Sequence, residues 1–319
     1  MSSPSILTRG KRKSASQKQG SDYLLSTKKQ KGYFGMIELK NVSYVYSESG
    51  PFQSTALDDI SLKIEDGMFY ALIGHTGSGK TTLVQLISGL IKPTGGEILV
   101  DGVNIADKKI KMRDIPKKIG VVFQYPEYQL FEETVYRDIS FGPRNMGLCE
   151  DEIKRRVLSA AHAVGLPEEV LEGSPFELSG GQKRRAAIAG TISMEPDVLI
   201  LDEPTAGLDP GGRDDILNEI KKLHSEKKIT VILVSHSMED VAKTAERVIA
   251  VNHGRLAMEA PVREVFSRGE ELRKMGLSVP CISRIADRLR KSGVDIRGDI
   301  FTVDEAVAEI VSLAGGKAL

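Results

Sequence analysis

The chain has 319 residues, enough for one large domain with an appendage, and its 40% hydrophobic content is ordinary for a soluble globular protein. Its 44 basic residues balance 44 acidic ones, which argues against nucleic-acid binding, and no apolar run approaches the roughly 18 residues of a membrane-spanning helix. The two cysteines, Cys149 and Cys281, lack disulfide-framework or zinc-site spacing and fit a reducing, cytosolic compartment.

Positive charge is concentrated at the beginning of the chain. Residues 1–35 carry eight basic residues against one acid, Asp22, so the remaining chain has 36 basic against 43 acidic residues. Ser, Lys and Gln dominate this tail without a hydrophobic period, which predicts disorder. Met36 is a candidate initiator. We expect residues 1–35 to be an inert or mistranslated extension rather than a segment that binds anionic lipid or nucleic acid.

A patterned sequence begins after this tail. Apolar and more polar residues alternate as in half-buried strands, the apolar set being Ile37, Leu39, Val42, Tyr44 and Tyr46. The next expected elements are a buried strand at 69–73, a glycine loop, a helix from Lys80 to about Gly89 and a strand near 121–123. An irregular stretch rich in Pro, Tyr and Gln follows that strand.

The second half continues the alternation of strands and helices. The expected elements are a helix-rich segment at 150–170, a helix opening at Ser179, strands at 198–202 and 230–235, and a pair of apolar runs across 247–258. Short apolar runs between helical segments predict a mostly parallel sheet covered by helices. The predicted fold class is therefore α/β, with one nucleotide-binding domain over residues 36–265 and a helical subdomain at about 125–190.

Residues 266–319 differ from the preceding domain. Pro280 stands where a helix can start, and apolar residues then repeat at helical spacing among charged ones: Ile282, Ile285, Ala286 and Leu289. Such a stripe needs a cover. Amphipathicity leaves open whether the cover is the chain's own domain or a partner subunit.

The segment after the strand at 69–73 matches the phosphate-loop pattern, with Gly74, His75, Thr76, Gly77, Ser78, Gly79, Lys80 and Thr81, followed by Thr82. Backbone N–H groups of such a loop hold phosphates at a helix N-terminus. Lys80 is placed to neutralise the β and γ phosphates, and the Thr81 hydroxyl to ligate Mg²⁺. A phosphate loop alone leaves kinases, GTPases, helicases and motors open.

The apolar strand at 198–202 ends in two acids, Asp202 and Glu203. Ligands of parallel sheets bind at the carboxyl ends of the strands, so both acids are candidates for chemistry. We expect Asp202 to hold Mg²⁺ through its coordination shell and Glu203 to polarise the attacking water. Taken alone, an acidic pair at a strand end is more often part of a solvated sheet edge. The phosphate loop earlier in the chain favours the catalytic role here.

The run Leu178, Ser179, Gly180, Gly181 and Gln182 narrows the field to one superfamily. With the other motifs it resembles the ATP-binding cassette (ABC) ATPases over about residues 37–256. In that family this signature opens a helix whose N-terminus faces the γ-phosphate bound by the other subunit. The resemblance implies a P-loop NTPase fold of ABC type with a helical subdomain. It also implies a productive site made by two chains arranged head to tail.

Further roles follow from the resemblance alone. Tyr46 matches the aromatic residue that stacks on adenine, with Tyr44 as a close competitor. Gln124 matches the glutamine that touches metal and water and couples the site to the transmembrane partner. Asp209 matches the aspartate that crosses the dimer interface, and His236 the histidine that contacts the γ-phosphate.

Four segments are similar to one branch, the energy-coupling factor (ECF) transporter ATPases, and most like the second of its two paralogous ATPase subunits: residues 74–77, 123–131, 141–143 and 275–280. This implies a peripheral protein on the cytoplasmic face of the cell membrane. Its implied partners are the paralogous ATPase, a membrane scaffold subunit and a substrate-binding membrane subunit that together import a vitamin or metal ion. A homodimer, a cobalt/nickel-type importer and a soluble ABC ATPase are the alternatives.

The resemblance also implies that residues 266–319 help the ATPases to dimerise, which favours a partner-facing stripe. The segment after Gln124 has its own rationale for coupling. Apolar side chains lie beside acids there, suited to gripping a helix that carries basic residues: Tyr125, Tyr128, Leu130 and Phe131 beside Glu127, Glu132 and Glu133. A structural helix-start loop is the alternative.

Overall fold

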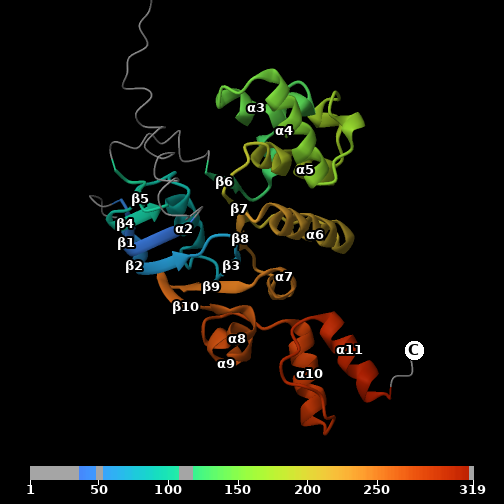
Figure 1. The fold of residues 1–319 in the computed structure, drawn as a ribbon. Coiled ribbons are helices and arrows are strands. Elements are labelled where there is room, and N and C mark those ends of the chain that lie inside the picture. Colours follow the sequence, from blue (N-terminus) through green and yellow to red (C-terminus); the bar gives the residue numbers. More distant parts are fainter. Residues whose placement is uncertain (1–35, 48–52, 108–117, 316–319) are drawn as a thin grey trace, which may run out of the picture.

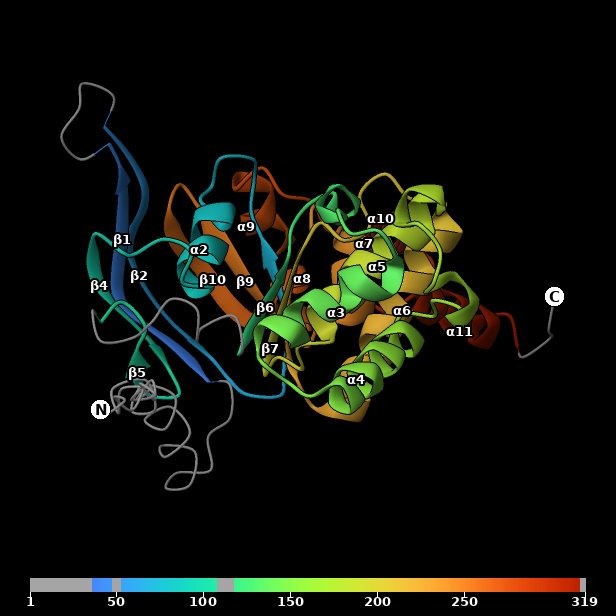
Figure 2. The same ribbon diagram turned by 90° about the horizontal axis from the view of Figure 1, so that it is seen from above.

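The computed structural model describes residues 36–47, 53–107 and 118–315. The tail at 1–35, predicted to be disordered, lies outside the described residues. Two sheets form the frame of the protein, and helices cover the larger one (Figures 1 and 2). Within the described part of the chain, no helix combines the length and apolar character needed to cross a membrane.

The larger sheet has six strands in the order β10-β9-β3-β8-β7-β6. Its strands are β3 (Phe69–Ile73), β6 (Ile119–Val122), β7 (Val198–Asp202), β8 (Thr230–Val234), β9 (Arg247–Asn252) and β10 (Arg255–Pro261). All neighbouring strands are parallel except β9 and β10. Every residue of β3 and β8 is buried, as expected for strands covered on both faces. The predicted mostly parallel sheet is confirmed.

A second, antiparallel sheet was not foreseen. It has four strands in the order β2-β1-β4-β5. These are β1 (Ile37–Tyr46), β2 (Ser54–Ile64), β4 (Gly95–Val100) and β5 (Val103–Asn104), of which only β1 was predicted. The β1 register shifts between Leu39 and Val42, where Asn41 has a φ of 50°, so the bulge keeps both apolar side chains buried.

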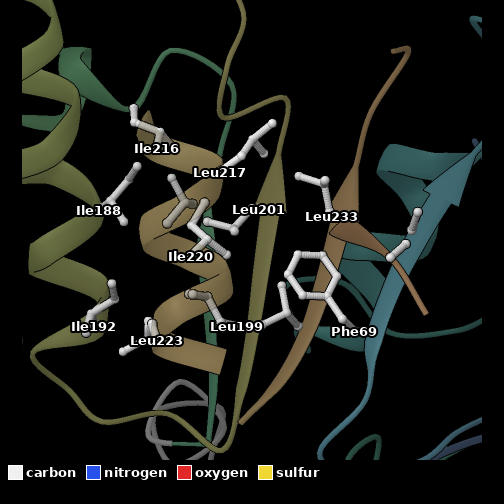
Figure 3. Close-up of a cluster of buried hydrophobic side chains, with 14 of the residues drawn as sticks. Phe69, Ile188, Ile192, Leu199, Leu201, Ile216, Leu217, Ile220, Leu223 and Leu233 are labelled. Carbon is white, nitrogen blue, oxygen red and sulfur yellow. The ribbon is translucent and has the colours of Figure 1, made fainter. Parts of the chain in front are cut away.

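Successive residues of the parallel strands point into two separate cores. Figure 3 shows Leu199 and Leu201 of β7 facing α5 (Gly180–Ile192) and α6 (Pro210–Lys227). The alternate residue Ile200 faces the other core, which contains α2 (Lys80–Ile87) and the antiparallel sheet. Burying each such side chain contributes about 1.5–3 kcal/mol. The sheet therefore separates α2 from α5.

The helical subdomain contains α3 (Val135–Asn145), α4 (Glu150–Ala163) and α5, with short 3-10 helices at η2 (Pro126–Gln129), η3 (Glu168–Val170) and η4 (Pro175–Glu177). Helix α3 was not predicted from the sequence. Pro143 lies inside this helix, and Thr134 caps its start through Arg137 N at 3.2 Å. Burial of Val135 and Ile139 outweighs the low helix propensity of Gly142 and Pro143.

The C-terminal helices pack partly on the main domain and partly on each other. They are α7 (Met238–Thr244), α8 (Val262–Ser267), α9 (Gly269–Lys274), α10 (Cys281–Lys291) and α11 (Val303–Leu313). Phe266, Leu272 and Phe301 join the core shared with α5 and α6. An additional small cluster contains Ala286, Ile296, Ile300 and Ala306.

The apolar stripe of α10, for which a partner-facing role was favoured, is covered in part by the chain itself. Ile282 and Leu289 are partly buried and pack against the small C-terminal cluster, so the chain itself supplies part of their cover. Only Ile285, 46% exposed, fits the original expectation. The longer exposed apolar face belongs instead to α11 and comprises Val303, Val307, Ile310 and Leu313.

Candidate active site

The carboxyl ends of four parallel strands meet at one edge of the six-stranded sheet. Val122 of β6 pairs with Leu201 of β7, Asp202 with Val234 of β8, and Leu72 of β3 with Val234. The predicted residues Gly74, Gln124, Glu203 and His236 each follow one of these strand ends. The topology thus brings four sequence motifs to the place where such sheets bind ligands.

The phosphate loop is closely packed between β3 and α2. Lys80 is buried, and its Nζ donates to the carbonyl oxygens of Gly74 at 2.7 Å and His75 at 3.1 Å. Burial lowers the pKa of Lys80, whereas the charges of Glu203 and Asp202 raise it. The ammonium group therefore belongs to the same electrostatic cluster as the two acids.

The start of α2 has the form of an anion site. Gly79 precedes the helix with a φ of 107°, and no side chain caps the first N–H groups. These groups are therefore free to bind phosphate oxygens. A Cβ at Gly79 would lie 2.6 Å from Leu57 Cδ2 and 2.7 Å from the Ala56 carbonyl oxygen, so only glycine fits here.

The tyrosine predicted to stack on adenine lies beside α2. Tyr46 is 43% exposed, and its hydroxyl lies 3.2 Å from Thr82 Oγ1. Tyr44 meets Tyr46 edge to face at 4.8 Å between ring centroids but packs against the core. Tyr46 is therefore the tyrosine with a face open to a ligand. Thr81, at the second position of α2, is also exposed.

Glu203 is held in an unusual backbone conformation next to Asp202. Its φ is 53°, a backbone conformation that residues other than glycine adopt only when the surrounding structure imposes it. Its N–H donates to the Val234 carbonyl oxygen at 3.0 Å. Burial, and then the charge of Asp202, raise the pKa of Glu203. Burial also raises the pKa of Asp202. Both acids therefore lie where their charged forms are disfavoured.

His236 faces Glu203 across the edge of the sheet. Its Nε2 lies 3.5 Å from Glu203 Oε1, a buried oxygen with no hydrogen-bond partner. Burial, and then the charge of Lys80, lower the pKa of His236, so the ring is neutral at neutral pH. An unsatisfied carboxylate oxygen beside a neutral imidazole can accept a hydrogen bond from a water molecule.

The residues predicted to hold Mg²⁺ supply oxygen donors of three kinds: the Thr81 hydroxyl, the Asp202 carboxylate and the Gln124 carboxamide. Mg²⁺ prefers such oxygens and keeps several waters or phosphate oxygens in its shell. Among the described residues, no group of three or more His, Cys, Asp or Glu side chains could hold a metal ion. The three oxygen donors fit Mg²⁺ that completes its shell with phosphate oxygens and water.

The signature begins α5 away from the phosphate loop of the same chain. Ser179 caps the helix, with Gln182 N donating to Ser179 Oγ at 3.3 Å and Ser179 N donating to Gln182 Oε1 at 3.0 Å. Leu178 packs on the core. A Cβ at Gly180 or Gly181 would meet nothing within 4 Å. Packing within the described part of the chain therefore does not require glycine at either position.

Asp209 has a local structural role that was not predicted from the sequence. It caps α6, and its Oδ1 accepts from Gly212 N at 2.7 Å. The loop carrying it starts at Glu203, whose carbonyl oxygen accepts from Ala206 N at 3.1 Å. The exposed Asp209 and Gly207 leave this loop accessible from outside the chain.

The turn between β9 and β10 belongs to the site but was missed. The His253 ring lies 4.8 Å from the His75 ring between centroids, and Gly254 N donates to the Ser78 carbonyl oxygen at 2.9 Å. Ser78 Oγ and Asn252 Oδ1 are buried here without a hydrogen-bond partner. No sequence motif marked this turn, because its role depends on β9 lying next to β3.

Comparison with known proteins agrees with this geometry. Residues 57–206 match the family described as ABC transporter. The chain is 53% identical over 280 residues to the energy-coupling factor transporter ATP-binding protein EcfA2 of Caldanaerobacter subterraneus subsp. tengcongensis, covering 88% of this chain and 98% of the relative. It is 55% identical over 278 residues to the protein of that name from Clostridium perfringens, covering 87% and 98%.

Solved structures show the same fold. One similar structure is cbiO1 from Clostridium perfringens, part of the ABC transporter complex cbiONQ, with a TM-score of 0.67, 39% identity and coverage of 76% of this chain and 94% of that one. Another is the dimeric ATP-binding cassette MJ0796 bound to ADP and Pi, with a TM-score of 0.63, 31% identity and coverage of 71% and 98%. The chain therefore belongs to the energy-coupling factor transporter ATP-binding proteins of the ABC transporter family.

Proposed function

We propose that this ABC ATPase binds ATP with Mg²⁺ in sites that two chains build together, and that hydrolysis there powers an ECF importer. One observation carries the shared site. The phosphate loop begins α2 on one face of the six-stranded sheet, while the signature begins α5 on the other (Figure 1). The sheet lies between the two helix starts, which supports a signature that serves a nucleotide bound by another chain.

The glycines of the signature support this arrangement. Among the described residues, nothing lies within 4 Å of a Cβ added at Gly180 or Gly181, and both have ordinary helical backbone, so the room beside them is open to a group from outside the chain. The N-terminus of α5 and the Ser179 hydroxyl offer donors to an anion. Leu178 and Gln182 hold the start of this helix in place, and Asp209 extends the same contact surface.

Within one chain, the geometry supports the following roles. The backbone N–H groups of Gly74 to Thr82 and the Lys80 ammonium bind the phosphates, and Tyr46 stacks on the adenine. When bound, Mg²⁺ neutralises phosphate charge, held by Thr81, Asp202 and Gln124. Glu203 accepts a hydrogen bond from the attacking water and draws its proton, and His236 donates toward the γ-phosphate.

The partners of this chain are proposed from its surface. The exposed apolar face of α11 is suited to a second ATPase subunit, which we infer to be a paralogue, with a homodimer as the alternative. Tyr128, 83% exposed, and Phe131 offer apolar contacts to a membrane scaffold subunit that works with a substrate-binding subunit. The chain thus sits peripherally on the cytoplasmic membrane face and drives vitamin or metal-ion uptake.

A second candidate function is supported by the similarity to cbiO1, which is part of the ABC transporter complex cbiONQ: this chain would then serve an importer of that type.

Glu203→Gln tests the function. The substitution keeps the size of the side chain but removes the carboxylate that activates water, so hydrolysis should fall by about 10²-fold or more while ATP still binds. Size-exclusion chromatography with Mg²⁺ and ATP should then show a stable ATPase dimer that wild-type protein forms only transiently. Wild-type turnover by this variant in the assembled complex would contradict the assignment of Glu203.

A further inference from the structure

Arg184 forms a buried ion pair next to the site, and none of the motifs accounts for it. It lies on α5, two residues after Gln182, and is only 2% exposed. Its Nε and Nη2 lie 3.2 Å and 3.0 Å from the two carboxylate oxygens of Glu127 in η2. A charge buried so completely is stable only when paired and hydrogen-bonded.

The same guanidinium group also reaches a third segment. Its Nη1 donates to the carbonyl oxygens of Pro204 at 3.2 Å and Ala206 at 2.5 Å. These carbonyls belong to the loop that connects Glu203 with Asp209. One planar side chain therefore holds together the signature helix, the segment after Gln124 and the loop after Glu203.

The three segments carry different parts of the proposed ATP site. Glu127 follows Gln124 by three residues, and Pro204 directly follows Glu203. Arg184 itself lies in the second turn of the helix that Ser179 caps. Any movement of η2, for instance when Tyr128 contacts another subunit, changes the position of Glu127 and so acts directly on the Arg184 fork.

We propose that Arg184 is a positioning residue, which transmits the position of the Gln124 segment to the signature helix and to the loop that carries Glu203. Its guanidinium group is buried and bonded to Glu127, Pro204 and Ala206, so it acts through the alignment of the segments that carry these partners. The inference rests on the proposed function. Beyond that function, we infer that the three segments move as one unit, because the bidentate pair with Glu127 and the two hydrogen bonds to carbonyl oxygens share one guanidinium group.

The neighbouring Arg185 provides a matched control. It lies on the same helix and is ion-paired with Glu219 and Asp215 of α6. Those contacts fasten α5 to α6 but reach neither η2 nor the loop at 204–206. A loss of activity that follows from general weakening of α5 should therefore appear in both arginine variants, whereas a positioning defect should appear only at Arg184.

The test compares Arg184→Lys, Arg185→Lys and wild type in the complete transporter complex that copurifies with the full chain. Lysine keeps the charge but cannot bind a carboxylate and two separate carbonyls at once. We expect kcat for ATP hydrolysis to fall about tenfold in Arg184→Lys, with KM for ATP and ATP binding within about twofold of wild type, because small misplacements of catalytic groups are costly. Arg185→Lys should keep kcat within about twofold of wild type.

A double-mutant cycle with Glu127→Gln tests the connection itself. If Arg184 acts through Glu127, adding Glu127→Gln to Arg184→Lys should lower kcat little further. Should Arg184→Lys not fold, as judged by its melting temperature, replacing both partners by methionine removes the pair without leaving a lone buried charge, and kcat should still fall.

Three results would overturn the inference: kcat of Arg184→Lys within twofold of wild type, equal losses in the two arginine variants, or multiplicative losses in the cycle. A wild-type complex that neither binds nor hydrolyses ATP would instead refute the proposed function, independently of Arg184.

Discussion

The two glycine motifs should respond in opposite ways to the same substitution. At Gly181, in the first turn of α5, an added methyl group meets nothing within 4 Å and the backbone is helical. Gly181→Ala should leave the free energy of unfolding unchanged or raise it by up to about 1 kcal/mol, since alanine favours helix. At Gly79, a left-handed φ costs about 1–2 kcal/mol and the collisions with Leu57 and Ala56 about 1–3 kcal/mol more.

The stabilities of Gly181→Ala and Gly79→Ala should therefore differ by about 2–6 kcal/mol, measured by urea unfolding of the full chain without nucleotide. At Gly181, ATP hydrolysis and folding stability should respond differently to the substitution. Because a methyl group there occupies the space into which the partner's nucleotide must fit, Gly181→Ala should lose ATP-dependent dimerisation and most of its hydrolysis. The reasoning is refuted if Gly181→Ala is destabilised like Gly79→Ala, or if it hydrolyses ATP at the wild-type rate.

Four further predictions concern pH and partners. Hydrolysis should decline in acid with a midpoint above the ordinary glutamate pKa, because burial and Asp202 raise the pKa of Glu203; a pH–rate profile checks this. Because the pKa of Glu203 is higher in the folded chain than in the unfolded chain, this residue stabilises the fold fully at pH values below its unfolded pKa and loses that contribution as pH rises. The melting temperature of nucleotide-free Glu203→Gln should therefore exceed that of wild type at neutral pH and approach it in acid, as measured by thermal unfolding at several pH values. Tyr128→Asp should abolish transport into vesicles while the detached ATPase pair still hydrolyses ATP, and loss of both would contradict the coupling role. Val307→Asp on α11 should weaken ATPase pairing about tenfold in ultracentrifugation, with unchanged affinity refuting that contact.

Much of the architecture could be read from local patterns. The strands β3, β7 and β8 are continuous apolar runs, and the helices α2 and α5 start where their glycine motifs predict. The antiparallel sheet and α3 were missed. A bulge at Asn41 interrupts the strand period in β1, and Pro143 speaks against a helix that only tertiary burial stabilises.

The sequence by itself determined the chemistry of the site, because each motif places reactive groups within a few residues of a strand end or helix start, where local geometry suffices. Only the tertiary structure decided how these motifs relate to one another. It put the phosphate loop and the signature on opposite faces of one sheet, brought His253 to His75, covered most of the α10 stripe and joined Arg184 to Glu127. Such contacts join residues far apart in the chain, and the packing of the whole sheet fixes them rather than any local period.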